Sequence, residues 1–375
     1  SGFGVAAENI EELVQPGTLH IGMTDEQPAV ALIQFAEGDP QASSPWVSSR
    51  PSGTAVTAFL RDGQMDIALE PAVYNVIVHW GPECEYVQET VEIQSGQTAQ
   101  FTGTKECVEL PSGVMSFDPH SHSSPSADGK ISMAQRIMTH AAHSIDLHIS
   151  TEHDHIADFR PIIAALGLGE HIETMVGSEI SPPVKGHINA YPLIPKETES
   201  NFGVPDWWSE AKPTQILFDE IRVLLGDNGI IQANHPIGSS GLLVAAEYNL
   251  NTGVIESPYY WSPDFQTMEL INGGYEDYLP YYFNLISRGK FVTPVGVSDS
   301  HSYSAGVGRD RTYANASNQA EVLEALNGQQ VVATKGAYVH ATINDAFAPG
   351  GTFIGVQELK VEVFAPSWLV TDVVL

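Results

Sequence analysis

Basic residues are scarce in this chain of 375 residues. It has 16 Lys and Arg against 46 Asp and Glu, which gives a formal net charge of −30. Such a composition excludes binding of nucleic acid or anionic lipid through a basic surface, because that affinity comes largely from Lys and Arg that face phosphates. Most of the carboxylates are expected to keep the surface soluble. An anionic substrate must therefore meet its positive charge locally.

Long apolar runs are also missing. No stretch approaches the roughly 20 apolar residues that a membrane-spanning helix needs, and residues 1–9 lack the basic and apolar segments of a signal peptide. The numbering begins at a serine, so either a signal peptide has already been removed or this residue was added for expression. Because 42% of the positions are hydrophobic, the chain is expected to bury a large core and to hold more than one domain.

Only two cysteines occur, Cys84 and Cys107. Both lie near the ends of neighbouring predicted strands, so a disulfide is geometrically plausible. It would be worth on the order of 3 kcal/mol and would indicate an oxidising compartment, hence a secreted or periplasmic protein. The alternative is two separate thiols buried in a β core. A structural zinc site is disfavoured, because no histidine or further cysteine lies at ligand spacing.

The chain divides into three predicted regions. Residues 1–111 contain short β runs separated by turn signals, which predict a small β-sandwich. Residues 112–340 alternate strands with helices, and residues 341–375 read as a further β segment that stops inside an apolar run, so a truncation is expected there. The predicted helices are 133–143, begun by a Ser132–Gln135 capping box, and 214–225, 281–287 and 320–326.

Repeated β/α units in the second region imply an α/β fold with a mainly parallel sheet that closes into a barrel. Two segments interrupt the units. Residues 196–213 carry Trp207-Trp208, and residues 238–263 carry Tyr259-Tyr260-Trp261. Both are interpreted as long ordered loops, which either overhang a site or pack over the barrel.

Polar clusters follow the apolar runs of this second region directly. Because residues just past parallel strands converge on one face of a barrel, these distant clusters are expected to meet in space. The clusters are Asp118-Pro-His120-Ser-His122, Glu152-His153-Asp154-His155, Ser178-Glu179, Asn234-His235 and Asp299-Ser-His301.

His-x-His at a strand end places both imidazoles on one side, where a single cation can take both. Imidazole mixed with carboxylate suits zinc, manganese or iron, so two or three divalent cations are expected.

The order of the motifs resembles the PHP family, named for polymerase and histidinol phosphatase. The motifs are His120-Ser-His122, Asp128-Gly129, Thr151-Glu152-His153, Glu179, Gly186-His187, Asn234-His235-Pro236 and Ser298-Asp299-Ser-His301. The nearest branch is the carbaryl-hydrolase-like metallohydrolases, which place a small β domain before the barrel. The resemblance covers about residues 117–336.

The resemblance implies a distorted (β/α)7 barrel with up to three cations. One would take His120, His122, Glu179 and Asp299, a second would share Glu179 and take His187 and His235, and a third would take Asp128, His153 and His301. The sequence departs from the family at Glu152, where an aspartate is usual, which puts in doubt the surroundings of the neighbouring ligand.

Two further residues are candidate catalytic groups. His155 lies one alternation beyond His153, so it either acts as an acid at the site or caps the following turn. Arg311 is a candidate clamp for an anionic oxygen, although a structural ion pair is the commoner fate of such an arginine; Arg309 shares both alternatives. Among the other histidines, His140, His143 and His171 are interpreted as surface or capping residues, and His148 as a core histidine.

Hydrolysis of a phosphate ester is the leading functional hypothesis. Two cations bridged by Glu179 would hold a hydroxide, because metal binding lowers the pKa of water from about 16 towards about 7. A carbamate or carboxylic ester hydrolase using the same centre is one alternative, and a non-catalytic metal-dependent binding module is another. The expected partner is a small-molecule ester, with no nucleic acid and no membrane.

Overall fold

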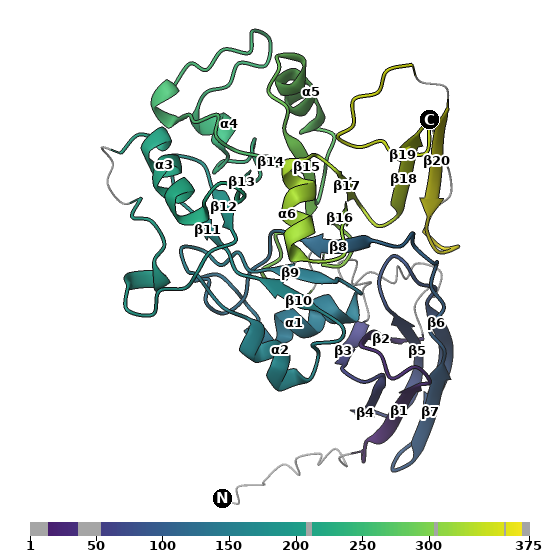
Figure 1. Cartoon of the computed structure of the whole chain (residues 1–375). Coiled ribbons are helices and arrows are strands. Elements are labelled where there is room, and N and C mark those ends of the chain that lie inside the picture. The colour runs from purple at the N-terminus through teal and green to yellow at the C-terminus, as the bar shows by residue number, and fades with distance from the viewer. Residues whose placement is uncertain (1–13, 37–53, 208–211, 304–306, 356–357, 370–375) are drawn as a thin grey trace, which may run out of the picture.

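The computed structural model describes residues 14–36, 54–207, 212–303, 307–355 and 358–369, and it shows a mixed α/β protein. In Figure 1 the purple-to-blue N-terminal strands form a group of their own beside the helix-bearing middle of the chain, with β3 next to α1. Among the described residues, every helix is too short or too polar to span a bilayer.

The N-terminal strands form two sheets, ordered β4-β1-β7 and β3-β2-β5-β6, which share one apolar core. Leu19, Ile21 and Phe101 of the first sheet meet Ala31, Ile33 and Val76 of the second in that core. The strands are β1 (Gly17–Met23), β2 (Ala29–Phe35), β3 (Thr54–Leu60), β4 (Gln64–Leu69), β5 (Ala72–His79), β6 (Val87–Ile93) and β7 (Thr98–Gly103).

The predicted disulfide is confirmed: Cys84 is bonded to Cys107. The residue before it, Glu83, forms an ion pair with Arg311 (3.2 Å) and accepts a hydrogen bond from Tyr313 Oη (2.8 Å). The Cys84 carbonyl accepts a hydrogen bond from Trp368 Nε1 (2.9 Å). Glu83 and Cys84, which follow the N-terminal strand β5, therefore contact both the middle of the chain and its last described residues.

The middle of the chain alternates strands and helices, and the predicted helices are all present within two residues of their expected bounds. The helix α1 begins with the predicted capping box, in which Ser132 and Gln135 bond each other's backbone N–H. The helices are α1 (Met133–Ala142), α2 (Arg160–Leu166), α3 (Thr214–Leu225), α4 (Leu242–Ala245), α5 (Leu279–Ser287) and α6 (Gln319–Asn327), with the 3-10 turns η3 (Ser200–Phe202) and η4 (Pro258–Tyr260).

The strands of this region form two five-stranded sheets, β10-β9-β8-β16-β17 and β11-β12-β13-β14-β15. They are β8 (Val114–Asp118), β9 (Leu147–Ile149), β10 (Glu173–Met175), β11 (Ser178–Ile180), β12 (Ile188–Tyr191), β13 (Ile230–Ala233), β14 (Thr267–Asn272), β15 (Thr293–Val297), β16 (Arg311–Asn315) and β17 (Val331–Thr334). A separate antiparallel sheet, β19-β18-β20, follows with β18 (Tyr338–Ile343), β19 (Ala346–Phe347) and β20 (Leu359–Phe364).

The expectation of a mainly parallel sheet is wrong in part. The pairs β8–β9, β9–β10, β13–β14 and β14–β15 are parallel, whereas β11–β12, β12–β13, β8–β16 and β16–β17 are antiparallel. Between β11 and β12 the reason is chain length, because residues 181–187 are too few for the crossover of about a dozen residues that a parallel pair needs.

The two sheets contact each other in two places. Beside β11, Glu179 forms an isolated parallel bridge with His153, which follows β9. Beside β15, Thr312 Oγ1 of β16 bonds both the N–H and the carbonyl of Gly296, each at 2.9 Å. A further isolated bridge, between Ser121 and Ser300, places the end of β8 next to the end of β15.

The helix α1 is covered by the N-terminal sheet, and this corrects part of the interpretation of two histidines. His140 and His143 are fully buried, not surface residues, whereas the capping alternative is confirmed for His143, which is the C-cap of α1. Ala142 packs on Val30, Leu32 and Ile77 of that sheet, so this side of α1 is closed off from solvent. His148 is a core histidine as interpreted, with Nδ1 at 3.0 Å from Thr174 Oγ1.

Four buried histidines predict a loss of stability in mild acid. Burial lowers the pKa of His143 to about 4 and lowers the pKa values of His79, His140 and His148 well below the ordinary value. In the unfolded chain these imidazoles take up protons near about pH 6.5. Below that pH the unfolded state binds more protons than the folded state. The contribution of these histidines to the free energy of unfolding is therefore fully present above about pH 6.5 and is lost as the pH falls towards about 4.

The variant His143→Gln removes one of these groups while keeping a donor for the Thr139 carbonyl, which lies 2.6 Å from His143 Nδ1. Between pH 7 and pH 4 the free energy of unfolding should fall less in this variant than in the wild type. The difference should be about 3 kcal/mol at pH 4, since one pKa unit corresponds to about 1.4 kcal/mol. Urea unfolding at several pH values measures this, with His171→Gln at a half-buried position as control. Parallel pH profiles for His143→Gln and wild type would contradict the assignment.

Candidate metal centre

Nine predicted ligands lie together at the strand ends, and Glu179 is at the middle of them. Glu179 is fully buried in β11. Its carboxylate lies within 3.6 Å of five imidazoles, those of His120 (3.4 Å), His122 (3.6 Å), His153 (2.7 Å), His187 (3.1 Å) and His235 (3.4 Å). Asp299 adds contacts to His120 (3.3 Å) and His122 (3.2 Å), and Asp128 adds contacts to His153 (3.5 Å) and His301 (3.2 Å).

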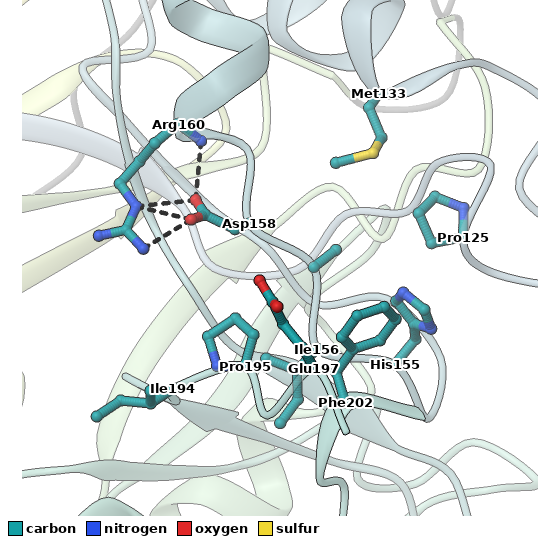
Figure 2. Close-up of a pocket in the computed structure, with 11 residues that line it drawn as sticks. Pro125, Met133, His155, Ile156, Asp158, Arg160, Ile194, Pro195, Glu197 and Phe202 are labelled. Atoms are coloured by element: carbon teal, nitrogen blue, oxygen red, sulfur yellow. Dashed lines mark hydrogen bonds and ion pairs between the residues drawn. The ribbon is translucent and has the colours of Figure 1, made fainter. Parts of the chain in front are cut away.

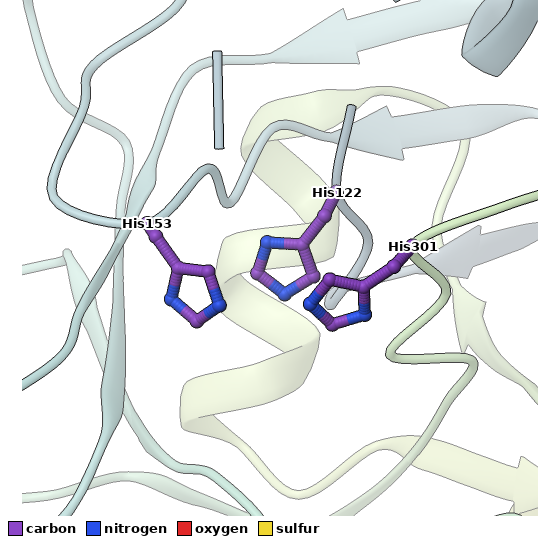
Figure 3. A group of neighbouring side chains, drawn as sticks. All are labelled: His122, His153 and His301. Atoms are coloured by element: carbon purple, nitrogen blue, oxygen red, sulfur yellow. The ribbon is translucent and has the colours of Figure 1, made fainter. Parts of the chain in front are cut away.

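Three groups within this set have ligand atoms that all lie within 4.8 Å of one another. They are His122–His153–His301, His120–His122–Asp299 and His153–Glu179–His187. Figure 3 shows the first of them, in which His122 lies between the other two rings. Its ring stacks on that of His153, with centroids 4.3 Å apart, and on that of His301, with centroids 4.1 Å apart.

The rings of His120 and His122 are oriented by hydrogen-bond acceptors that contact their Nδ1 atoms. His120 Nδ1 lies 2.5 Å from Glu269 Oε1, and His122 Nδ1 lies 3.0 Å from Ser126 Oγ. In the neutral imidazole, which is the form that binds a cation, a ring that donates through Nδ1 has a free electron pair on Nε2. Both Nε2 atoms face the same place, 3.0 Å from each other, beside Asp299 Oδ1.

Glu152, the departure from the family pattern, acts on His122 through Ser126. Its carboxylate accepts hydrogen bonds from the Ser126 hydroxyl (2.5 Å) and from the Ser123 N–H (2.9 Å). Because the Ser126 hydroxyl donates to Glu152, its oxygen is left to accept from His122 Nδ1. The longer glutamate therefore reaches the loop that carries His122 and orients this ligand.

The charges at the site oppose the effect of burial. Burial raises the pKa of Glu179, but the charge of His120 and the close contacts with the imidazoles of His120, His153 and His187 outweigh it, so that pKa lies well below its ordinary value. Burial likewise raises the pKa of Asp299, but His120 and His122 bring it below the ordinary value. Both carboxylates are therefore ionised at neutral pH, as metal ligands must be.

The donor set fits divalent cations. Six imidazoles and three carboxylates converge, the mixture that zinc, manganese and iron accept. Glu179 Oε2 is buried and lies 2.7 Å from His153 Nδ1, yet the alignment is too poor for a hydrogen bond. An ionised, buried oxygen without such a bond is costly unless a cation takes it.

Strained backbone occurs at the site itself. Asp154, His235 and Asp299 have φ angles of 49°, 25° and 47°, in the left-handed region that non-glycine residues rarely adopt. Such conformations cost on the order of 1–3 kcal/mol each and persist where surrounding contacts fix them. Here they fix the direction of two predicted ligands and of the residue that follows His153.

His155 is not among the three ligand groups. It lines a cavity of about 420 Å³ together with Pro125, Met133, Ile156 and Phe202, and Figure 2 shows its imidazole next to the Phe202 ring. The two rings meet edge-on, with centroids 4.8 Å apart. His155 thus lines a cavity next to the loop of a predicted ligand, with only one residue between it and His153.

Arg311 requires a correction, because the structure does not place it at the metal centre. Its side chain is fully buried in β16. The guanidinium pairs with Glu83 and donates to the carbonyls of His143 (2.7 Å) and Gly308. These partners satisfy the charge at the junction with the N-terminal sheets, so Arg311 is a structural ion pair and cannot clamp an anion at the site. Arg309 pairs with Asp310 (2.7 Å).

The first long loop reaches the neighbourhood of the site. Trp207 Nε1 donates to Asp154 Oδ1 (2.6 Å), next to His153; Trp208 lies outside the described residues. In the second long loop, Trp261 packs against the core around Phe265, with ring centroids 5.8 Å apart. One loop therefore approaches the metal centre and the other covers the sheet.

Two buried charged residues at the site escaped the sequence analysis. Arg136 of α1 donates to the carbonyls of His122 (2.8 Å), Ser300 (2.6 Å) and Ser302 (3.0 Å), and so ties two ligand loops together. Glu269 of β14 contacts His120, as described above. The available signal for Glu269 was a single carboxylate inside the otherwise apolar run Met268–Ile271.

Comparisons with protein-family models and with curated proteins found no match. Solved structures show partial likeness. A two-domain protein from Bacteroides vulgatus ATCC 8482, containing a predicted PHP-like metal-dependent phosphoesterase, aligns with a TM-score of 0.42 and 20% identity over 64% of this chain and 76% of its own. PsfC from Pseudomonas syringae PB-5123 aligns with a TM-score of 0.36 and 13% identity over 55% of this chain and 84% of its own. All these scores are below 0.5, so the functional conclusion depends on the site itself.

Proposed function

We propose that this chain is a metal-dependent phosphoesterase of the PHP family. The observation that carries the proposal is Glu179, a fully buried carboxylate within 3.6 Å of five imidazoles, with Asp128 and Asp299 at the edges of the same cluster. The order of the motifs along the chain supports the family. The two five-stranded sheets, which contact each other beside β11 and beside β15, support a distorted seven-unit barrel, and the preceding β-sandwich supports the carbaryl-hydrolase-like branch.

The proposed ligand sets are those that the family resemblance implies, with Glu179 shared between two cations. When bound, divalent cations supply a nucleophile from water at neutral pH and neutralise the charge on a phosphoryl oxygen. Glu269 orients His120 and Ser126 orients His122, so that the Nε2 atoms of both rings face the proposed cation position. Asp299 and Glu179 would supply the negative charge that retains the cations. Because the cations would activate water as the nucleophile, no serine or cysteine nucleophile would be required.

His155 remains the proposed acid for the departing alcohol. Its imidazole lines a cavity whose walls include apolar residues, and it follows the ligand His153 at a distance of two residues, which span at most about 7 Å. A general acid matters most when the departing oxygen needs a proton. The role therefore concerns substrates with poor leaving groups.

A substrate panel tests the proposed activity. The protein is loaded with Mn²⁺ or Zn²⁺ and assayed with an aryl phosphodiester, an aryl phosphomonoester, an aryl carbamate and an aryl carboxylate ester that share one chromophore. Hydrolysis of a phosphoester, abolished by a chelator, is the expected result. Turnover of only the carbamate or the carboxylate ester would replace the phosphoesterase by the first alternative. Stoichiometric cation binding with no turnover at all would favour a binding module.

The same proposal places the protein outside the cytoplasm. The Cys84–Cys107 disulfide is the supporting observation, because such bonds persist in oxidising compartments. The strongly acidic composition supports a small-molecule ester as the partner, in preference to nucleic acid or a membrane surface.

A further inference from the structure

Glu269 is connected to three predicted ligands that come from three different loops. It is fully buried in β14. Its Oε1 lies 2.5 Å from His120 Nδ1, and its Oε2 accepts a hydrogen bond from the backbone N–H of His235 (2.5 Å). Asn272 Nδ2 donates both to Glu269 Oε2 (3.0 Å) and to Asp299 Oδ2 (3.2 Å). One carboxylate thus contacts ligands of both cation positions that share Glu179.

Each of these contacts fixes the orientation of one predicted ligand. Donation from Nδ1 to Glu269 points the Nε2 electron pair of His120 into the site. The hydrogen bond to the His235 N–H holds that residue at its strained φ of 25°. Asn272 occupies Asp299 Oδ2 and leaves Oδ1 beside the two Nε2 atoms of His120 and His122.

We propose that Glu269 couples the two cation positions that share Glu179, so that occupation of one favours occupation of the other. This inference rests on the proposed metal-dependent function. A cation held by His120 and Asp299 immobilises Glu269 through the ring and through Asn272. Glu269 then keeps His235 in the conformation that binds the second cation. By thermodynamic linkage, the second cation raises the affinity for the first by the same factor.

The test is a cation titration of the full chain carrying Glu269→Gln, which keeps the shape but leaves only one acceptor oxygen. An NH₂ group then faces either His120 Nδ1 or the His235 N–H. Co²⁺ is titrated into chelator-treated protein and followed by calorimetry and by its visible absorption, which reports the ligand geometry. The wild type is expected to bind two ions cooperatively. Glu269→Gln is expected to bind them in two separate steps, at least one weakened by about 10–100-fold, with an altered absorption spectrum.

The matched control is Glu324→Gln, at an exposed position of α6, which should titrate like the wild type. Unchanged binding in Glu269→Gln overturns the coupling, and so does uniformly weaker binding that stays cooperative, because that pattern indicates a structural role only. If the wild type binds no Co²⁺, the proposed function fails as well. Should Glu269→Gln not fold, Asn272→Ala removes only the link to Asp299. Reduced cooperativity in that variant supports the proposal, and unchanged cooperativity overturns it.

Discussion

Glu179→Gln is expected to lower turnover by about 100-fold or more for every substrate, because it removes a negative charge that two cations would share in the proposed centre. The amide cannot replace the ionised carboxylate, which lies within 3.6 Å of five imidazoles and is fully buried. The loss should therefore appear in the metal content as well as in the rate. Steady-state kinetics together with elemental analysis of the same preparation measure both effects.

Two comparisons make the result on Glu179 specific. Glu324→Gln, the same chemical change on the exposed face of α6, should leave rate and metal content unchanged. His155→Ala should keep its metals and slow unactivated esters more than activated ones, because only the former need a proton on the leaving oxygen. Glu179→Gln with full metal content and near-normal rates would show that Glu179 is not shared between cations.

Removal of divalent cations by a strong chelator is expected to abolish hydrolysis and to lower the thermal midpoint of unfolding. A cation at 100 to 1,000 times its dissociation constant stabilises the fold by about 3–4 kcal/mol per site, so its removal destabilises the protein by a similar amount. The purified protein should contain two or three ions per chain, since nine converging ligands exceed what one ion can use. Zn²⁺, Mn²⁺ or Fe²⁺ added back should restore both properties.

The thermal measurement has an internal control. Chelation should shift the midpoint of Glu179→Gln less than that of the wild type, because this variant has fewer ions to lose. Chelation does not reduce the Cys84–Cys107 bond, so a shift reports the metal centre alone. Full activity in the presence of the chelator, with no metal found by elemental analysis, would exclude a metal-dependent mechanism.

The sequence by itself determined the composition of the site and several local features. His-x-His at the end of β8, the polar residues after β9, β13 and β15, and Glu179 in β11 are readable because strand ends and side-chain alternation follow from short-range patterns. The capping box of α1 is equally local, with a donor and an acceptor three residues apart. The two cysteines left a single possible disulfide within the chain.

The tertiary structure decided which charged side chains meet. Arg311 pairs with Glu83, 228 residues away, and Glu269 contacts His120, 149 residues away. His140 and His143 became buried because an N-terminal sheet covers α1, and no pattern within the helix records that cover. The physical reason is common to all of these cases. Periodicity and caps depend on neighbours within one element, whereas the environment of a buried charge depends on which distant elements pack around it.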